Sequence, residues 1–367
     1  MSRSDGEARS TPAPGTPAPG TPAPGGVCPP VGIQLEGIIL PPVLTLDVVL
    51  GLLGNAVALW VFCFRLKRWN ANTVFLVNLV AADFLALVSL PLRIHALLAG
   101  RWVFGDVACR LNLFLMFSNR TASIALMTVI AFYRYAKVVH PLGRLTRLNK
   151  RQAGVLALLV WLLVSAPRLP MLAYDHIKRG RGAPQCFFFT SYQEASRGIV
   201  ILVAMHRALT VLEFVVALAL LLFCWVRIRR SLMSHRQMGD GGKVRKALRV
   251  CAAIVAIFLL CFLPTSVTTL GLWLSRSLRP HDCAAFYALT QLTIVSLGLN
   301  FLNSALDPIL YVFSSSVFRK ALLAAVPPRL RRCRAWDADS SESGGASRST
   351  GQVELGTVRP TPAAEAL

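Results

Sequence analysis

Three charged residues lie deep inside long apolar stretches of the sequence. They are Asp83, Arg120 and Asp307. A charge at the centre of a bilayer costs roughly 2.5 to 3.5 kcal/mol on insertion scales, so each needs a partner or an inward-facing site. Buried carboxylates suit a hard cation, and a buried guanidinium suits an anion that it can bind bidentately. We therefore expect the chemistry of this protein at these positions.

The elements that position these charges are seven apolar stretches. The chain is 54% hydrophobic and 15% charged, which is too apolar for an ordinary soluble domain. Its longest runs exceed the roughly 18 residues that a membrane span requires. Spans are expected near 38–64, 72–98, 111–137, 153–175, 199–227, 247–274 and 284–312. The predicted fold is an all-α membrane protein, a bundle of seven transmembrane helices.

Basic residues predict the orientation of this bundle. They gather in the connectors that share a side with the C-terminus, around residues 65–68, 137–151 and 227–249. By the positive-inside rule that side is cytoplasmic, which places the N-terminus outside the cell and the protein in the plasma membrane. The net charge of +22 then reflects topology and attraction to anionic membrane lipids. Nucleic acid is not an expected partner, since no exposed aromatics alternate with the basic residues.

The two ends of the chain have a different composition from the bundle. Residues 10–26 repeat Thr-Pro-Ala-Pro-Gly, and residues 336–367 are rich in Ser, Gly, Glu and Pro. Such segments stay extended and cannot bury a core. We predict a disordered N-terminus over 1–37, the seven-helix bundle over 38–325 and a disordered tail over 326–367.

Cysteines follow the predicted topology. Four of them fall outside the membrane or at its outer edge, namely Cys28, Cys109, Cys186 and Cys283. An even set in an oxidising compartment predicts two disulfides, and four cysteines allow three pairings. On the opposite side, Cys333 follows several arginines and is either a palmitoylation site or a free thiol.

A series of motifs runs through the spans in order. It comprises Gly54-Asn55, Leu79-Val80-Ala81-Ala82-Asp83, Arg134-Tyr135, Trp161, Cys261-Phe262-Leu263-Pro264, Asn303 and Asp307-Pro308-Ile309-Leu310-Tyr311. Over roughly residues 38–325 this series resembles the rhodopsin-like (class A) family of G-protein-coupled receptors. The stretches Trp102-Val103-Phe104-Gly105 and Asn119-Arg120-Thr121-Ala122-Ser123 are similar to the oxoeicosanoid and hydroxycarboxylic acid receptor group. The second stretch leans toward the oxoeicosanoid member.

Arg120 is the main candidate for binding a ligand. Its helical neighbours Met116, Phe117 and Ile124 are apolar, so the sequence gives its guanidinium no local partner. The resemblance implies that the arginine at this position binds the carboxylate of an anionic ligand. An ion pair with a bundle acid such as Glu213 is the alternative.

Two further residues bear on the ligand, and both are interpreted through the resemblance. Arg93 follows Pro91 by two residues and is expected to help draw the anion inward. Phe301 stands where hydroxycarboxylic acid receptors have a tyrosine hydroxyl that helps bind the carboxylate, so it favours a long lipid tail. The expected ligand is an oxidised fatty acid, and a short hydroxycarboxylic acid is the alternative.

A basic loop precedes Cys186 and contains Lys178, Arg179 and Arg181. These residues either add a positive field at the entrance of the pocket or form an ordinary solvated loop.

Polar residues of several spans converge at mid-bundle if the resemblance holds. They are Asp83, Ser123, Asn303, Ser304 and Asp307. We expect an allosteric sodium ion and waters here, held chiefly by Asp83, and no other cofactor. A purely structural hydrogen-bond cluster is the alternative. Pro264 and Pro308 kink their helices beside these polar groups.

The resemblance also implies how a signal leaves the bundle. Arg134, Tyr135 and Tyr311 are expected to couple to a G protein, usually of the inhibitory class, and arrestin is a further expected partner. Tyr133 stands where the family usually has an acid, which makes basal activity conceivable. Residues 316–322 are expected to form a short amphipathic helix along the membrane.

The resemblance also bears on the disulfides. The family pattern pairs Cys109 with Cys186, and we predict that Cys28 pairs with Cys283.

Other classes of function are less well supported. No set of nucleophile, base and orienting group is evident, so the chain is not expected to be an enzyme. A transporter would show paired repeats with broken helices, and a retinal pump would need a lysine in the last span, which has none. A scavenger receptor that binds ligand without signalling is a further alternative, favoured by Tyr133.

Overall fold

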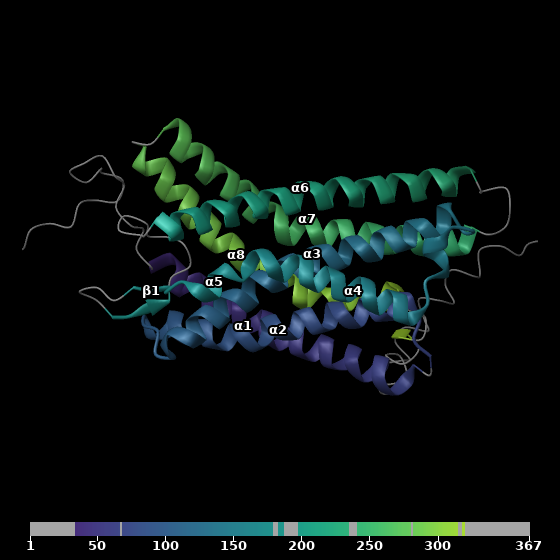
Figure 1. Cartoon of the computed structure of the whole chain (residues 1–367), viewed down its shortest axis with the longest axis horizontal. Coiled ribbons are helices and arrows are strands. Elements are labelled where there is room, and N and C mark those ends of the chain that lie inside the picture. The colour runs from purple at the N-terminus through teal and green to yellow at the C-terminus, as the bar shows by residue number, and fades with distance from the viewer. Residues whose placement is uncertain are drawn as a thin grey trace, which may run out of the picture. The chain divides into compact units, whose positions relative to one another are not determined.

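The computed structural model describes residues 34–66, 68–178, 183–186, 197–234, 241–279, 282–314 and 318–319. These residues belong to one compact unit that ends at Arg319, and the second unit, Lys320–Leu367, lies outside the described residues. The long helices are α1 (Gln34–Trp60), α2 (Ala71–Ala99), α3 (Gly105–Val139), α4 (Lys150–Ser165), α6 (Arg197–Ser234), α7 (Gly241–Leu278) and α8 (Cys283–Ser314). They run side by side along the bundle (Figure 1).

These seven helices coincide with the seven predicted spans, although the fourth is broken. Six helices of the described chain are long and apolar enough to cross a membrane, and α4, with 16 residues, is not among them. A 3-10 turn, Ala166–Arg168, and the short helix α5 (Pro170–Ala173) continue its path. Pro167 and Pro170 explain the breaks, because proline lacks the backbone N–H that a regular helix needs. The predicted seven-helix fold is confirmed.

Side chains at the ends of two helices fix where they begin. Asn70 accepts a hydrogen bond from the backbone N–H of Thr73 (3.0 Å) at the start of α2. Asn149 and Gln152 form a reciprocal capping box at the start of α4, with bonds of 2.9 and 3.1 Å. At the other end of α2, Gly100 takes a left-handed conformation (φ 64°) that stops the helix. Such caps satisfy backbone groups that the helix itself leaves unpaired.

A small hairpin covers one end of the bundle. Strands β1 (Ile177–Lys178) and β2 (Gln185–Cys186) pair antiparallel, with Ile177 opposite Cys186. The disulfide Cys109–Cys186 ties the hairpin to α3, with a Cα–Cα distance of 5.7 Å, so this predicted pairing is present. Cys283 is also disulfide-bonded, while its predicted partner Cys28 lies outside the described residues. We call this end of the bundle the disulfide end, and it carries β1 and α5 in Figure 1.

Close packing joins α1 to α8 near the middle of the bundle. A Cβ atom added at Gly54 would lie 2.4 Å from Cγ of Pro308, so only glycine fits there. Farther along, Phe62 packs against Tyr311 and Phe318, with ring centroids 5.7 and 6.0 Å apart. Of the predicted amphipathic helix 316–322, only Phe318 and Arg319 are described, and both are helical. Phe318 is buried.

Candidate functional site

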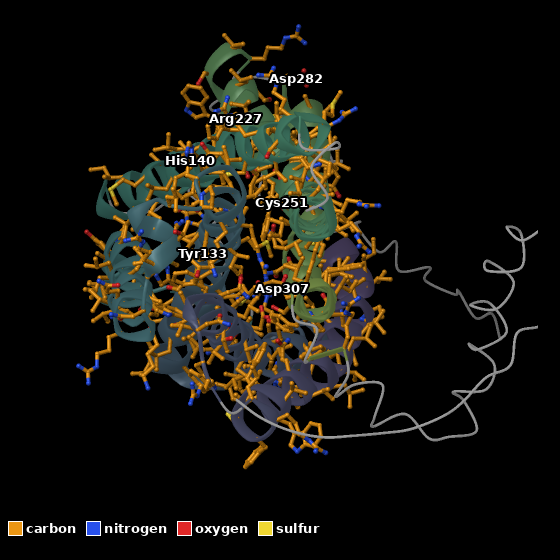
Figure 2. All side chains as sticks on the ribbon, turned by 90° about the vertical axis from the view of Figure 1, so that its right-hand side faces the viewer. Tyr133, His140, Arg227, Cys251, Asp282 and Asp307 are labelled. Atoms are coloured by element: carbon orange, nitrogen blue, oxygen red, sulfur yellow. A yellow bond between two sulfur atoms is a disulfide. The ribbon has the colours of Figure 1, made fainter. Side chains whose placement is uncertain are left out.

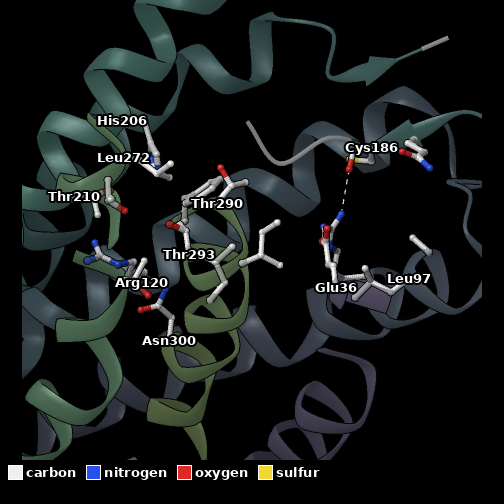
Figure 3. Close-up of a pocket in the computed structure, with 18 of the residues that line it drawn as sticks. Glu36, Leu97, Arg120, Cys186, His206, Thr210, Leu272, Thr290, Thr293 and Asn300 are labelled. Atoms are coloured by element: carbon white, nitrogen blue, oxygen red, sulfur yellow. Dashed lines mark hydrogen bonds and ion pairs between the residues drawn. The ribbon is translucent and has the colours of Figure 1, made fainter. Parts of the chain in front are cut away.

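A deep pocket opens at the disulfide end between the helices. It encloses about 1210 Å³, including its open mouth. Its walls come from α1, α2, α3, α6, α7, α8 and the hairpin. Arg120 lies at one side of this pocket and Glu36 at the opposite side, with Thr290 and Thr293 between them (Figure 3). We call these the inner end and the outer end.

Arg120 at the inner end is held by the protein itself. It is 5% exposed, and its guanidinium Nη1 donates to Oε2 of Glu213 on α6 at 3.2 Å. Its Nη2 donates to the Ser266 hydroxyl on α7 at 3.3 Å. The sequence predicted no partner among the helical neighbours of Arg120, and Glu213 and Ser266 indeed reach it from other helices. The ion pair with Glu213 that the sequence left as an alternative is present, yet Arg120 still lines the pocket.

A second buried arginine shares the same carboxylate, and the sequence reasoning missed it. Arg168 follows α4, is 2% exposed and donates from Nη2 to Oε1 of Glu213 at 2.7 Å. It also donates to Thr121 Oγ1 (3.0 Å) and contacts His206. The sequence did offer a signal for Arg168, since it is a basic residue between Pro167 and Pro170 inside the predicted span 153–175. Two arginines on one glutamate leave this cluster with a net charge of +1.

The outer end contains an ion pair that balances its own charge. Arg93 on α2 pairs with Glu36 in the first turn of α1, and both side chains are mostly buried. Arg93 also donates from Nη1 to the backbone oxygen of Cys186 at 3.1 Å. The sequence analysis pointed to Arg93 but missed its partner Glu36. The available signal was an acidic residue next to the start of the first predicted span.

The predicted ligand residues come together around two adjoining cavities. Arg93, Phe117 and Arg120 line the main pocket. Met116 and Phe301 line a smaller cavity, which shares Phe117, Arg120, Leu297 and Asn300 with the main pocket. Met116 and Phe301 also belong to one buried apolar cluster. The geometry groups Met116, Phe117, Arg120 and Phe301, while Arg93 lies at the outer end, and the role of all five in binding stays a prediction.

The predicted sodium residues are all buried, and Asp83 and Asp307 lie close to each other; we call the five residues together the mid-bundle cluster. Asp83, Ser123, Asn303, Ser304 and Asp307 are each at most 1% exposed. Tyr311 donates to Asp83 Oδ2 (3.3 Å) and to Asn55 Oδ1 (3.2 Å). Within the described chain, Asp83 Oδ1, the Ser123 hydroxyl and both Asp307 carboxylate oxygens lack a partner with hydrogen-bond geometry. Such oxygen donors fit a hard cation or waters. Figure 2 shows Asp307 toward the interior of the bundle.

The residues predicted to couple to a G protein divide between two places. The Tyr135 hydroxyl lies 3.0 Å from Nε2 of His140, and its ring packs on Phe223 of α6 at 5.3 Å. Tyr133, which replaces the usual acid, packs edge-on against Phe75 at 5.8 Å. Arg134 lies between these tyrosines near the end of α3 farthest from the disulfide. Tyr311 instead contacts the mid-bundle cluster.

Comparison with known proteins decides the family. The model of the "7 transmembrane receptor (rhodopsin family)" matches residues 54–311, which is most of the chain. The chain belongs to the rhodopsin family of seven-transmembrane receptors. It is 39% identical over 299 residues to human oxoeicosanoid receptor 1, covering 80% of this chain and 73% of that receptor. It is 34% identical over 307 residues to human hydroxycarboxylic acid receptor 2, covering 83% and 82%.

A third relative belongs to the same group of receptors. Human hydroxycarboxylic acid receptor 1 is 36% identical over 286 residues, covering 77% of this chain and 78% of that receptor. This rhodopsin-family receptor is thus a multi-pass membrane protein, and the prediction that it is not an enzyme is confirmed. The region matched by the family contains Asp83, Arg120 and Asp307.

Proposed function

We propose that this receptor recognises a ligand with one carboxylate and a long apolar chain, such as an oxidised fatty acid. The relatives named oxoeicosanoid receptor 1 and hydroxycarboxylic acid receptor 2 support a carboxylate ligand. The plasma membrane is the proposed location, with the disulfide end outside the cell and the basic connectors inside.

The observation that carries this proposal is the positive inner end of the pocket. Arg120 and Arg168 share Glu213, so one positive charge there is balanced by no other side chain of this cluster. A ligand carboxylate at Arg120 supplies that balance. Arginine presents a planar fork that matches a carboxylate, and the bond gains strength because the site is desolvated.

The walls of the pocket favour a long acid. Leu97, Leu272, Ile294 and Leu297 are among the apolar side chains that line the pocket. Buried apolar area contributes roughly 25 cal/mol per Å², so an alkyl chain laid along these side chains adds to affinity.

A short hydroxycarboxylic acid is the second candidate, supported by two buried polar atoms. Thr210 Oγ1 and Asn300 Oδ1 line the pocket, and neither has a hydrogen-bond partner among the described residues. A ligand hydroxyl near Arg120 can bond to either atom. Leaving them unpaired costs about 1 to 3 kcal/mol each, which gives a hydroxylated ligand an advantage.

The remaining proposals concern signalling and the mid-bundle cluster. Asp83 and Asp307, with Ser123 and Asn303 beside them, are proposed to hold a sodium ion that balances their charge. The end of the bundle around Arg134 and Tyr135 is proposed to bind a G protein of the inhibitory class, with arrestin as a further partner.

A ligand panel tests the proposed function. Oxidised long-chain fatty acids, short hydroxy acids and the methyl ester of each are applied to cells that express the receptor, and inhibition of cAMP formation is measured. We expect responses to free acids and weak responses to esters, because an ester offers no charge to Arg120. Equal potency of an acid and its ester contradicts the proposal. Uptake without any cAMP response points instead to a scavenger receptor.

A further inference from the structure

The outer end of the pocket contains an arginine, Arg93, whose guanidinium is paired with the carboxylate of Glu36. Arg93 presents one guanidinium nitrogen to the Cys186 carbonyl and another to the Glu36 carboxylate. The side chains of Arg93 and Glu36 are 11% and 14% exposed, so solvent screens them only partly. Both residues line the pocket, and the disulfide to α3 fixes the position of Cys186.

The two ends of the pocket differ in charge. Counting these paired groups alone, the inner end has a net charge of +1, from Arg120 and Arg168 against Glu213. The outer pair of Arg93 and Glu36 is neutral. Arg101 and Arg207 also line the pocket, so these counts describe the two ion-pair clusters and not the whole pocket. With the carboxylate at Arg120, as the proposed function has it, the chain of the ligand extends toward Glu36 (Figure 3).

We propose that Glu36 is a specificity-determining residue that closes a second anion subsite at Arg93 and restricts the pocket to acids with one carboxylate. This inference rests on the proposed function, since it takes the first carboxylate to bind at Arg120. Glu36 acts as a repulsive element, because a second carboxylate at the outer end meets a like charge on a mostly buried side chain.

Replacement of Glu36 by glutamine removes the charge with little change of shape. The amide oxygen can still accept a hydrogen bond from Arg93, and the bond from Arg93 to the Cys186 carbonyl does not involve residue 36. The Arg93 guanidinium then no longer faces the Glu36 negative charge. A dicarboxylic acid can bind Arg120 and Arg93 at once, whereas an acid with one carboxylate gains nothing.

Matched acids test this in the purified full-length receptor held in lipid nanodiscs. Decanoic and dodecanoic acids are compared with decanedioic and dodecanedioic acids, and apparent affinity is read from thermal stabilisation. In Glu36→Gln we expect the diacids to bind about tenfold more tightly than to the parent, as one added charge-assisted hydrogen bond allows. The monoacids should stay within about threefold.

Two further variants make the result specific. Glu36→Asp keeps the charge and should keep the rejection of diacids. Arg93→Gln added to Glu36→Gln should remove the gain, because it removes the proposed subsite. An unchanged ratio of diacid to monoacid affinity in Glu36→Gln, with unliganded stability near that of the parent, overturns the proposal.

The proposed function is judged separately in the same assay. Equal binding of the monoacids to the parent and to Arg120→Ala shows that Arg120 is not the anchor. A gain of diacid binding in Glu36→Gln would still support the subsite at Arg93 in that case, and no gain would overturn it.

Discussion

Two clusters of buried charged residues in the described chain have opposite sign. Arg120, Arg168 and Glu213 leave one positive charge beside the pocket. Asp83 and Asp307, both fully buried, bring two carboxylates together at mid-bundle. Uncompensated charges in a bilayer attract partners of opposite charge, so the first cluster suits an anionic ligand and the second a cation. The proposed anion and cation sites are therefore separate.

The cation cluster leads to a prediction for Asp83. Asp83→Asn should abolish any difference in thermal stability between the receptor in sodium chloride and in choline chloride at equal ionic strength. The reason is that a neutral amide cannot balance the charge of sodium. Thermal unfolding of the purified parent and variant measures this.

Asp282→Asn is the matched control for Asp83→Asn. Asp282 lies outside the cluster and accepts from the backbone N–H of Ala285 (3.0 Å), a capping role that asparagine also fills. This control should retain the sodium effect of the parent. If Asp83→Asn retains it too, sodium does not bind at this cluster.

Helices place these residues, and the sequence predicted the helices better than their contacts. The seven apolar stretches correspond to seven helices. The thickness of the bilayer sets the length of each span, and its apolar interior requires apolar side chains, so both features can be recognised in the sequence. The sequence named Glu213 only as an alternative partner and did not connect Arg168 to the site. Which side chain meets Arg120 depends on how α3, α6 and the turn after α4 face one another, and hydropathy does not encode that.

The contact between α1 and α8 gives a prediction for Gly54. Gly54→Ala should lower the stability of the receptor by about 1 to 3 kcal/mol, because the new Cβ meets the rigid ring of Pro308 at 2.4 Å. Thermal unfolding and surface expression measure the loss.

Gly154→Ala on α4 is the control for this packing argument. No atom lies within 4 Å of a Cβ added at Gly154, so the change should be neutral or slightly stabilising. Similar losses in both variants would show that helix packing at Gly54 is not the cause.

Across the whole molecule, α3 links the pocket to the opposite end. Arg120 lines the pocket, Ser123 lies in the mid-bundle cluster and Arg134 lies near the far end of the helix. At about 1.5 Å per residue, Arg120 and Arg134 are separated by roughly 20 Å. A carboxylate that binds Arg120 therefore acts on the same helix that is proposed to contact the G protein.

The most direct test of this account is replacement of Arg120. Arg120→Ala should weaken the response to active free acids by roughly 30-fold to a few thousand-fold, because a buried charged contact is worth about 2 to 5 kcal/mol. Surface expression should stay near that of the parent, since Glu213 keeps its 2.7 Å ion pair with Arg168. Arg120→Lys should recover little, because an ammonium lacks the planar fork. Dose–response curves for cAMP inhibition that are unchanged in Arg120→Ala would contradict the account.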